Sequence, residues 1–552
     1  MHARARARWA TSATLLTGVA IAIVASRAQS PFTPPLPPGT EASWPLRGSL
    51  SILGIDRLSR GAVAALGAAV IFAAAGAFLY SLGRAWRSEL SIRRVVAVAL
   101  LLHVLALAMP VFLSRDVYSY GFYGRMVSRY GANPYTDIPA QFYADPAYPF
   151  VSVDWIDSPS VYGPAFTSLS AGVTSVTSTP EQEVLAFKVL AVLASVATLL
   201  LVISAARRLA PERTVFAAAL IGWNPVVIFH GVAGAHNDAL LGLALSAGVL
   251  AVIARRELWA TAILALGTLV KVSGGVPLVM AVVAAAVRTR RRRLSTFARH
   301  AGIAALVALP FVIPFFQTED PTLGTLELAT RQGWLAPSRF VLSTLRGAAR
   351  AVGGETAADV VGLIVRVAFP LVFVWVLVML VRHLARDPDR IEPGHVVAAM
   401  GWAGVVSLLV SPVLLPWYMA WVLPLAWLLP RPARGGAVLL SLALAITELV
   451  AEPARSPGLY EAMVFGLHWV ATPVILLVLV RLVLDLRRRV ALGPRPGRED
   501  PLLAEEPVTS PASERVSGDG QDRRDGHGSG AAGKEPDAVG SHGGEDRDRD
   551  PD

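Results

Sequence analysis

The sequence contains no cysteine, and charged residues make up only 16% of it. The lack of cysteine excludes disulfides, cysteine-based zinc sites, iron–sulfur clusters and thiol catalysis. A soluble domain carries about 25% charged residues. The low charge therefore argues against a soluble protein, and the 54% hydrophobic content with a mean hydropathy of +0.52 favours a membrane protein.

Lysine is also scarce, because only Lys188, Lys271 and Lys534 occur in a chain whose formal net charge is +10. Arginine supplies nearly all of the positive charge. The basic residues fall in short clusters between apolar runs instead of along one face, so we expect no nucleic-acid partner. Clusters of this kind orient membrane helices, with the basic ends on the cytoplasmic side.

Apolar runs of helical length follow one another along most of the chain. They lie near 61–83, 93–113, 183–206, 214–230, 238–254, 258–270, 274–287, 300–316, 360–382, 395–411, 417–430, 435–450 and 462–484. A transmembrane helix needs about 20 apolar residues, and some of these runs are shorter. The sequence predicts an all-α polytopic membrane protein with about 12–14 transmembrane helices.

Composition divides the chain into three parts. Residues 1–60 hold an apolar stretch, which is either a membrane anchor or a cleavable signal segment, followed by a proline-rich outer linker. Residues 61–486 form the transmembrane domain. Residues 487–552 become rich in Gly, Pro, Ser, Asp and Glu without an apolar run, and predict a disordered cytoplasmic tail.

The basic residues between 84 and 94 should be cytoplasmic, which places whatever follows residue 113 outside. The same alternation puts the long loops 114–182 and 317–359 on the outer side, with the turns at 230–238, 271–274 and 412–417. Most of the unusual polar residues near the membrane then share one face. This asymmetry favours a reaction site at the outer surface over a pathway through the bilayer.

Asp116 stands in the run Ser114-Arg115-Asp116 at the outer end of a predicted span. A carboxylate at that depth is partly desolvated, which raises its pKa toward that of a general base. The structural alternative is that Asp116 pairs with Arg115 or caps the following helix. Both interpretations remain open on local sequence alone.

The residues after Asp116 combine aromatic and basic side chains at helical spacing, among them Tyr118 and Tyr120. This pattern predicts an interfacial helix, whatever the function. The outer loop continues with acidic and aromatic residues, including Asp145, Trp155 and Tyr162, a composition used in carbohydrate binding. The loop has no Asp-x-Asp pair, so we expect no bound metal.

A second polar cluster, His236-Asn237-Asp238, lies between two apolar runs. Placing such polar groups near a bilayer costs free energy, which favours a functional role for them. Its alternative role is to cap the next helix. Lys271 interrupts another apolar run, where an ammonium suits a phosphate anion at the interface or extends to lipid headgroups. Arg331 and Arg339 in the second long loop are weaker candidates for the same anion.

The segments SRDVYSYGFYGR, GANPY, DSPSVYGP, GWNP and GAHNDALL, taken together and in this order, resemble the actinobacterial polyprenol-phosphomannose-dependent α-1,6-mannosyltransferases. These are integral-membrane glycosyltransferases of the GT-C class. The resemblance covers roughly residues 60–480, so that residues 61–486 would form a GT-C catalytic domain with a large first outer loop carrying interfacial helices.

The resemblance implies transfer of mannose from polyprenyl-phosphate-mannose to a lipid-linked mannan acceptor at the outer face of the plasma membrane, without a cofactor. Asp116 matches the aspartate that acts as base in an inverting reaction, and Lys271 would stabilise the departing phosphate. His236, Asn237 and Asp238 would position sugar or phosphate. Arg115, Tyr118, Tyr120 and Tyr162 complete the expected donor- and acceptor-binding set.

The main rival is a polytopic transporter or a flippase of lipid-linked sugars, which would share the many spans and interfacial aromatics. The large outer loop and the lack of charge in mid-span argue against it. A non-catalytic scaffold would leave the clustered polar residues unexplained. An enzyme should bring Asp116, His236 and Lys271 to one site, whereas a transporter should hold its site near mid-membrane between two repeats.

Overall fold

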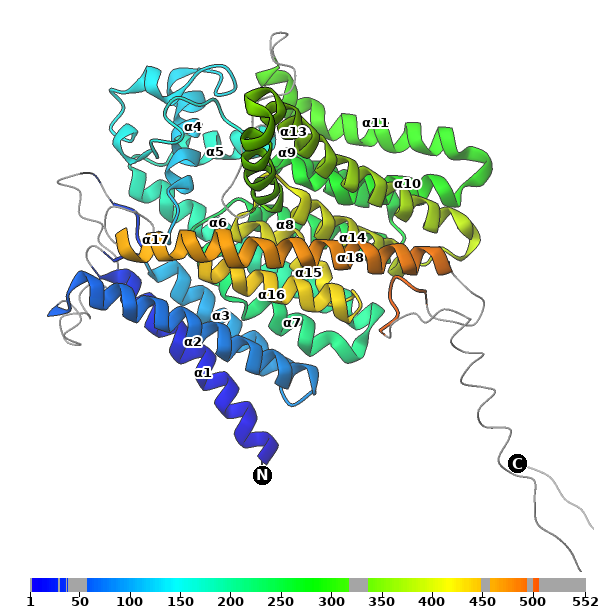
Figure 1. Cartoon of the computed structure of the whole chain (residues 1–552), viewed down its shortest axis with the longest axis horizontal. Coiled ribbons are helices and arrows are strands. Elements are labelled where there is room, and N and C mark those ends of the chain that lie inside the picture. Colours follow the sequence, from blue (N-terminus) through cyan, green and yellow to red (C-terminus); the bar gives the residue numbers. More distant parts are fainter. Residues whose placement is uncertain are drawn as a thin grey trace, which may run out of the picture. The chain divides into compact units, whose positions relative to one another are not determined.

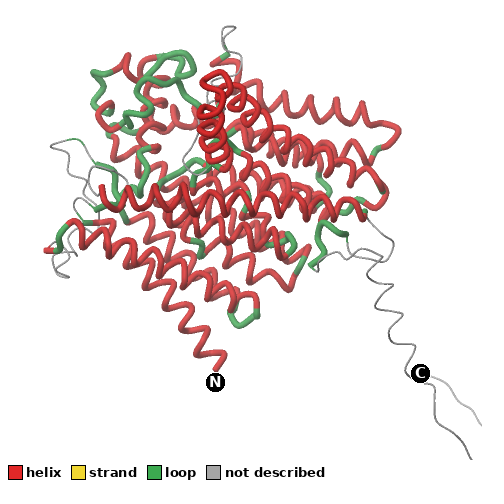
Figure 2. The backbone as a smooth tube through the Cα atoms, in the orientation of Figure 1, coloured by secondary structure: helices red, strands yellow, loops and turns green. Residues whose placement is uncertain are grey.

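The computed structural model describes residues 2–27, 30–35, 37, 57–316, 336–447, 457–493 and 500–505. The described part is helical, and Figure 2 shows helices joined by loops with no strand in it. Apolar runs interrupted by proline or polar turns explain this, because a helix satisfies its own backbone hydrogen bonds inside a bilayer. The predicted all-α fold is confirmed.

The helices of the first half carry the outer loop and much of the core (Figure 1). They are α1 (His2–Ser26), α2 (Arg60–Trp86), α3 (Ile92–Ala108), α4 (Asp116–Tyr130), α5 (Pro164–Val176), α6 (Pro180–Leu209), α7 (Thr214–Gly222), α8 (Asp238–Ile253), α9 (Glu257–Val270) and α10 (Gly275–Arg288). Short 3-10 and π segments join them: η3 (Pro139–Phe142), η4 (Tyr148–Phe150), η5 (Pro211–Arg213), η6 (Val226–Ala233), η7 (Val272–Gly274) and η8 (Arg290–Arg292).

The second half adds further helices, some of which pack beside α8, α9 and α10. They are α11 (Arg293–Val312), α13 (Pro337–Arg386), α14 (Pro393–Val410), α15 (Leu423–Ala426), α16 (Arg431–Thr447), α17 (Pro457–Gly466) and α18 (Thr472–Leu492). The short segments here are η9 (Ile313–Phe315), η10 (Pro388–Arg390), η11 (Pro416–Trp421) and η13 (Leu467–Ala471).

By length and composition, seven of the described helices are long and apolar enough to cross a membrane, or eight if the bent pair Pro211–Gly222 and Val226–Ala233 is one span. The apolar helices α3, α8, α9, α10 and α16 have only 14–17 residues. If each of these short helices also crosses the membrane, the number of spans reaches the predicted value of about 12–14. The exact number of spans stays a prediction.

Two expectations about the outer side change. The predicted loop 317–359 contains the start of α13, which runs from Pro337 and breaks at Gly354, where the backbone has φ +71°. Glycine suits this break because it alone adopts positive φ without steric cost. Arg339 therefore lies on a helix, and Arg331 falls outside the described residues.

The apolar run predicted at 417–430 is not one helix. It forms the 3-10 segment η11 and the four-residue helix α15. Pro416 and Pro424 explain the difference, because proline lacks the N–H that a continuous helix needs. The break turns three aromatic side chains, Trp417, Tyr418 and Trp421, toward the polar residues described below.

The predicted boundary of the tail at 487 also moves. Helix α18 continues to Leu492, and residues 500–505 pack on the transmembrane domain with Leu502 fully buried. His383 contacts both carboxylate oxygens of Asp500 at 3.1 Å, and Arg434 forms a 2.9 Å ion pair with Glu505. These polar contacts explain why an acidic segment is ordered here. Residues 506–552 lie outside the described residues.

Candidate active site

Asp116 is the first residue of α4, and the turn before it is held from two sides. The Asp116 N–H donates to Ser114 Oγ at 3.1 Å, and a carboxylate in the first turn is favoured by the helix dipole. Lys188 on α6 donates to the carbonyl of Met109, where α3 ends. An ammonium at a helix C-terminus is favourable for the same reason, so Lys188 fixes the end of α3 that leads to Asp116.

Helix α4 is held in place by a buried charge network around Arg125. Its guanidinium pairs with Glu183 of α6 at 2.7 Å and with Asp145 of the outer loop at 3.1 Å, and all three side chains are at most 4% exposed. Tyr130 Oη also donates to Asp145, at 2.8 Å. Asp145, which the sequence suggested for sugar binding, instead joins the loop to α4.

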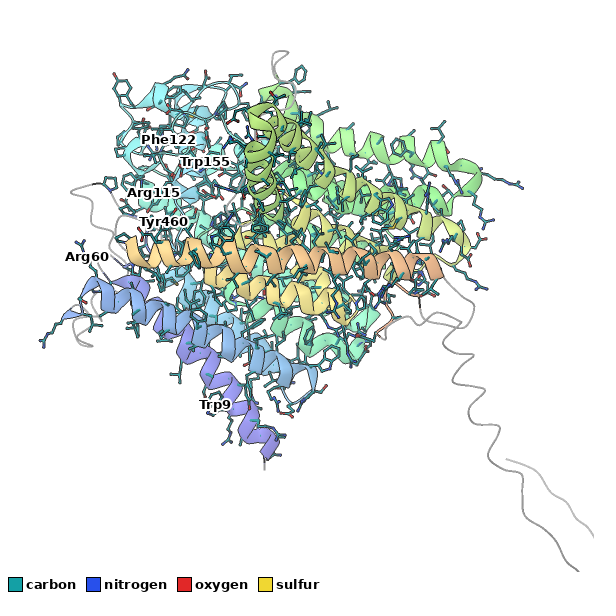
Figure 3. The ribbon with its side chains drawn as sticks, viewed as in Figure 1. Trp9, Arg60, Arg115, Phe122, Trp155 and Tyr460 are labelled. Atoms are coloured by element: carbon teal, nitrogen blue, oxygen red, sulfur yellow. The ribbon has the colours of Figure 1, made fainter. Side chains whose placement is uncertain are left out.

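The aromatic residues of α4 pack inside the protein. Tyr120 is 1% exposed and meets Tyr162 edge-to-face, with ring centroids 4.8 Å apart. Figure 3 shows Phe122 and Trp155 in the same region, on and beside α4. We expected these rings in the headgroup zone, but much of the aromatic set forms a second apolar core between α4, α5 and the outer loop. Large buried rings stabilise such a core through area and edge-to-face contacts.

Gly163 joins this outer loop to the end of α9. The Gly163 N–H donates to the Val270 carbonyl at 3.1 Å. A Cβ at this position would lie 2.1 Å from the Leu269 carbonyl oxygen, so only glycine allows the two backbones to approach so closely. The contact fixes the loop beside Lys271, the next residue after α9.

His236 lies on the turn between η6 and α8 and faces Asp116. Its Nδ1 is 3.7 Å from Asp116 Oδ2 and 3.4 Å from Tyr120 Oη. The ring stacks on Trp417, with centroids 3.6 Å apart and an interplanar angle of 12°. The imidazole side chain is fully buried, whereas the Asp116 side chain is 17% exposed. Asp116 is thus the accessible member of this pair.

Asp238 and Lys271 form a buried ion pair in the same region. Lys271 Nζ is 3.0 Å from each Asp238 carboxylate oxygen, and Trp421 Nε1 donates to Asp238 Oδ1 at 2.6 Å. The ammonium also lies over the Tyr418 ring, 4.3 Å from its centroid. A buried charge of either sign needs such partners to offset its loss of water.

Burial raises the pKa of Asp116 from 3.8 to about 6, although the Lys271 charge and hydrogen bonds from Ser114 and Trp155 lower it. Burial lowers the pKa of His236 well below its usual value, and the Lys271 charge adds to this effect. At neutral pH Asp116 is therefore ionised and His236 neutral. The 3.7 Å contact between them is a polar contact and not an ion pair.

Unpaired polar atoms mark the inner wall of the site. Among the described residues, His236 Nε2 and both amide atoms of Asn237 are buried without a hydrogen-bond partner. Buried polar groups normally have partners, so these atoms suit a polar ligand. A small apolar cavity of about 30 Å³ lies behind Trp417, lined among others by Val227 and Leu423.

The structure brings together Asp116, Tyr120, Tyr162, His236, Asp238 and Lys271, with Asn237 beside them. It places two predicted residues elsewhere. Tyr118 packs against Phe150, with ring centroids 5.4 Å apart, and Arg115 donates to the carbonyl of Pro35. Figure 3 labels Arg115 beside the outer loop. Their contacts with a substrate remain predictions.

Sequence reasoning missed Trp417, Tyr418 and Trp421. The signal was present as three aromatics within a run that opens with proline, Pro416-Trp417-Tyr418-Met419-Ala420-Trp421. We read that run as an ordinary span because it is almost wholly apolar. In the described part of the chain, no group of three His, Cys, Asp or Glu side chains is arranged to hold a metal ion.

Comparison with known proteins defines the class. Residues 32–287 match the family model described as alpha-(1->6)-mannopyranosyltransferase, N-terminal domain. The helical fold and this match define an all-α membrane glycosyltransferase.

Alpha-(1->6)-mannopyranosyltransferase A of Mycobacterium tuberculosis is 26% identical over 391 residues, which cover 67% of this chain and 70% of that protein. Alpha-(1->6)-mannopyranosyltransferase B of Corynebacterium glutamicum is 28% identical over 357 residues, covering 58% of this chain and 56% of that protein. The chain thus spans little more than half of the second relative. The predicted resemblance to the actinobacterial α-1,6-mannosyltransferases is confirmed, because residues 32–287 match their family model and both relatives carry that name.

Proposed function

We propose that the protein transfers mannose from polyprenyl-phosphate-mannose to a lipid-linked mannan acceptor, forming an α-1,6 linkage at the outer face of the plasma membrane. The observation that carries the proposal is the position of Asp116, a partly exposed carboxylate 3.7 Å from His236 in a site whose other polar groups are buried. The names of the relatives, alpha-(1->6)-mannopyranosyltransferases, support mannose as the sugar.

In the proposed reaction the acceptor hydroxyl oxygen attacks the anomeric carbon of the donor mannose. The new glycosidic bond forms as the bond from that carbon to the phosphate oxygen breaks, and the phosphate keeps the electron pair. The hydroxyl proton passes to Asp116. A single displacement of this kind inverts the anomeric configuration. One carboxylate suffices, because phosphate is a good leaving group, whereas glycosidases use two carboxylates.

A pKa of about 6 suits Asp116 for this role. The carboxylate is ionised at neutral pH and yet more basic than an ordinary aspartate, which is the compromise a general base needs. His236 borders the carboxylate on its buried side, and Tyr120 contacts the His236 ring. The acceptor then approaches from the exposed side.

Lys271 and Asn237 are proposed to hold the donor. An ammonium has three N–H donors, and the two Asp238 oxygens accept from it, which leaves donor capacity for a phosphate oxygen. The unpaired Asn237 amide would bind a sugar hydroxyl. Tyr162, which packs against Tyr120, is proposed to border the donor site, whereas substrate contacts of Arg115 and Tyr118 remain predictions.

The distribution of basic residues supports the proposed outer location. The turn between α2 and α3 carries Arg84 and Arg87, and α3 begins with Arg93 and Arg94, whereas Asp116 follows the other end of α3. Basic helix ends remain cytoplasmic, so Asp116 faces outward.

The test is transfer of radiolabelled mannose from polyprenyl-phosphate-mannose to a short α-mannoside by the purified protein and by Asp116→Asn. We expect the wild type to form an α-1,6 product and the variant to lose about 10²–10⁴-fold in rate, the usual contribution of a general base. Asp154→Asn removes an exposed carboxylate of the same loop and should keep full activity. An Asp116→Asn enzyme as active as the wild type would exclude Asp116 as the base. A wild type inactive with this donor but active with another lipid-linked sugar would exclude mannose.

A further inference from the structure

A groove with three arginines lies at the ends of α3 and α6 that are remote from Asp116. Its volume is about 620 Å³. It is lined by Ile92, Arg93, Val96, Ala97, Leu100, Leu200, Ile203, Ser204, Arg207 and Arg208. The basic residues come from the first turn of α3 and the last turn of α6, so the two helices run in opposite directions along the groove.

The groove is distinct from the candidate active site. Helix α3 has 17 residues, which at a rise of about 1.5 Å each places its two ends roughly 25 Å apart. Arg93 lies near the first end, and the turn leading to Asp116 follows the second. A molecule in the groove would therefore act on the opposite side of the membrane from the proposed mannosyl transfer.

The charge of the groove is not neutralised within the described chain. Some arginines on this side have carboxylate partners: Arg84 pairs with Glu89, Arg213 with Glu505, and Arg288 with Glu257. Among the described residues, no ion pair joins Arg93, Arg207 or Arg208 to an acidic side chain. All three are exposed, so a concentrated positive charge faces the mouth of the groove.

The floor of the groove is apolar and open to the side. Leu100 is 43% exposed and Leu200 is 54% exposed, and with Val96 and Ala97 they form a continuous apolar surface below the arginines. Three guanidinium groups above an apolar wall match an amphiphile that has an anionic head and hydrocarbon chains. A small soluble anion would use the arginines but not the wall.

We propose that this groove binds an anionic phospholipid of the leaflet opposite the active site, with its phosphate on Arg93, Arg207 and Arg208 and an acyl chain along Leu100 and Leu200. Ser204 offers one further hydrogen bond to the head. Basic pockets between transmembrane helices on the cytoplasmic side bind such headgroups, and each arginine near the surface adds to the attraction. A nucleic acid would use the charge but leave the wall uncovered.

Native mass spectrometry of the full chain in detergent, titrated with phosphatidylglycerol, tests the proposal. The test variant is Arg93→Gln/Arg207→Gln/Arg208→Gln. The control is Arg291→Gln/Arg292→Gln/Arg293→Gln, which removes the same charge from exposed residues outside the groove. We expect one phosphatidylglycerol to bind the wild type and the control, and roughly a hundredfold weaker binding to the test variant.

Three further measurements distinguish an anionic phospholipid from a neutral lipid and from free phosphate as the ligand of the groove. Phosphatidylcholine, with a neutral headgroup, should bind far more weakly than phosphatidylglycerol, and inorganic phosphate should not displace the lipid. Ala97→Trp, which fills the floor of the groove and keeps all three arginines, should also weaken binding. Equal loss in the test and control variants, equal binding of the two lipids, or displacement by phosphate would each overturn the proposal.

Discussion

His236 Nδ1 lies 3.7 Å from Asp116 Oδ2, and the imidazole is fully buried against Trp417 while the carboxylate is 17% exposed. The two residues are 120 positions apart in sequence: Asp116 begins α4, and His236 lies on the turn before α8. The buried imidazole covers one side of the Asp116 carboxylate, and the other side stays accessible to an acceptor. Because burial lowers the pKa of His236, the ring contributes no positive charge at neutral pH.

The dependence of the transfer rate on pH should follow the ionisation of the Asp116 carboxylate. With a pKa of about 6, the carboxylate is protonated in acid and cannot accept a proton from the acceptor. We expect the rate to rise about tenfold per pH unit below pH 6 and to level off by about pH 7. Initial rates between pH 4.5 and 8, with the protein checked for folding at each pH, measure this profile. A flat profile across pH 6 would show that Asp116 does not titrate in the rate-limiting step.

The raised pKa of Asp116 also predicts how the stability of the protein depends on pH. The raised pKa means that folding favours protonated Asp116, so the free energy of unfolding falls as pH rises from 3.8 to about 6 and the loss is complete above that range. Asp116→Asn removes the penalty. At pH 7.5 this substitution should raise the free energy of unfolding by at most about 3 kcal/mol. The gain should fall below this limit, because the carboxylate is 17% exposed and solvent screens its charge. Thermal unfolding should show this gain at pH 7.5 and little gain at pH 4.

Variants of the Asp238–Lys271 pair can distinguish a structural role of the pair from a functional role. Lys271→Met should cost about 3–5 kcal/mol, because it leaves Asp238 buried and charged without its cation. Adding Asp238→Asn removes that charge and keeps an acceptor for Trp421, so the double variant should recover most of the stability. We expect the double variant to stay at least tenfold less active than the wild type, because it lacks the ammonium proposed to meet the phosphate. Recovery of both stability and activity would make the pair purely structural.

Arg125 should be essential to the outer loop. Arg125→Leu leaves two buried carboxylates, Asp145 and Glu183, without their cation and should cost about 3–5 kcal/mol. Arg129→Leu is the matched control, since Arg129 is 34% exposed and 4.0 Å from Glu183, and should cost less than about 1 kcal/mol. Thermal unfolding in detergent compares the two. Similar costs would contradict the buried network.

The docked segment 500–505 can be tested by truncation. A chain ending at residue 493 loses the contacts of Asp500, Leu502 and Glu505, whereas a chain ending at residue 505 keeps them. We expect the shorter chain to unfold several degrees earlier and the longer one to match the full chain. Leu502→Asp in the full chain should reproduce the loss. Equal stability of the two truncated chains would mean that the segment contributes nothing.

Much of the site could be predicted from the sequence because topology alone sorts polar residues by membrane side. Asp116, His236 and Lys271 fall in different loops, and the alternation of basic clusters placed all three on one face. The pairing of Asp238 with Lys271 could not be predicted, since neither residue signals its partner in a single sequence. The aromatic wall was missed because an apolar run with two prolines looks like a span until the broken helix is seen.

Composition also misplaced the boundary of the tail. Residues 500–505 are acidic and close to proline, a pattern typical of disorder. What orders them is long-range: His383 on α13, Arg434 on α16 and Arg489 on α18 all bind this segment. Such contacts join residues from 12 to 117 positions apart, which no local pattern records.

The docked segment also bears on how the protein is made. Three helices that leave the ribosome at very different times share it as a common polar partner. Until synthesis passes Glu505, the ends of α13, α16 and α18 hold a histidine and two arginines without these partners. The bundle therefore completes its packing only after its last helix has been inserted. A nascent chain stalled before that point lacks the contacts of Asp500, Leu502 and Glu505 with these helices.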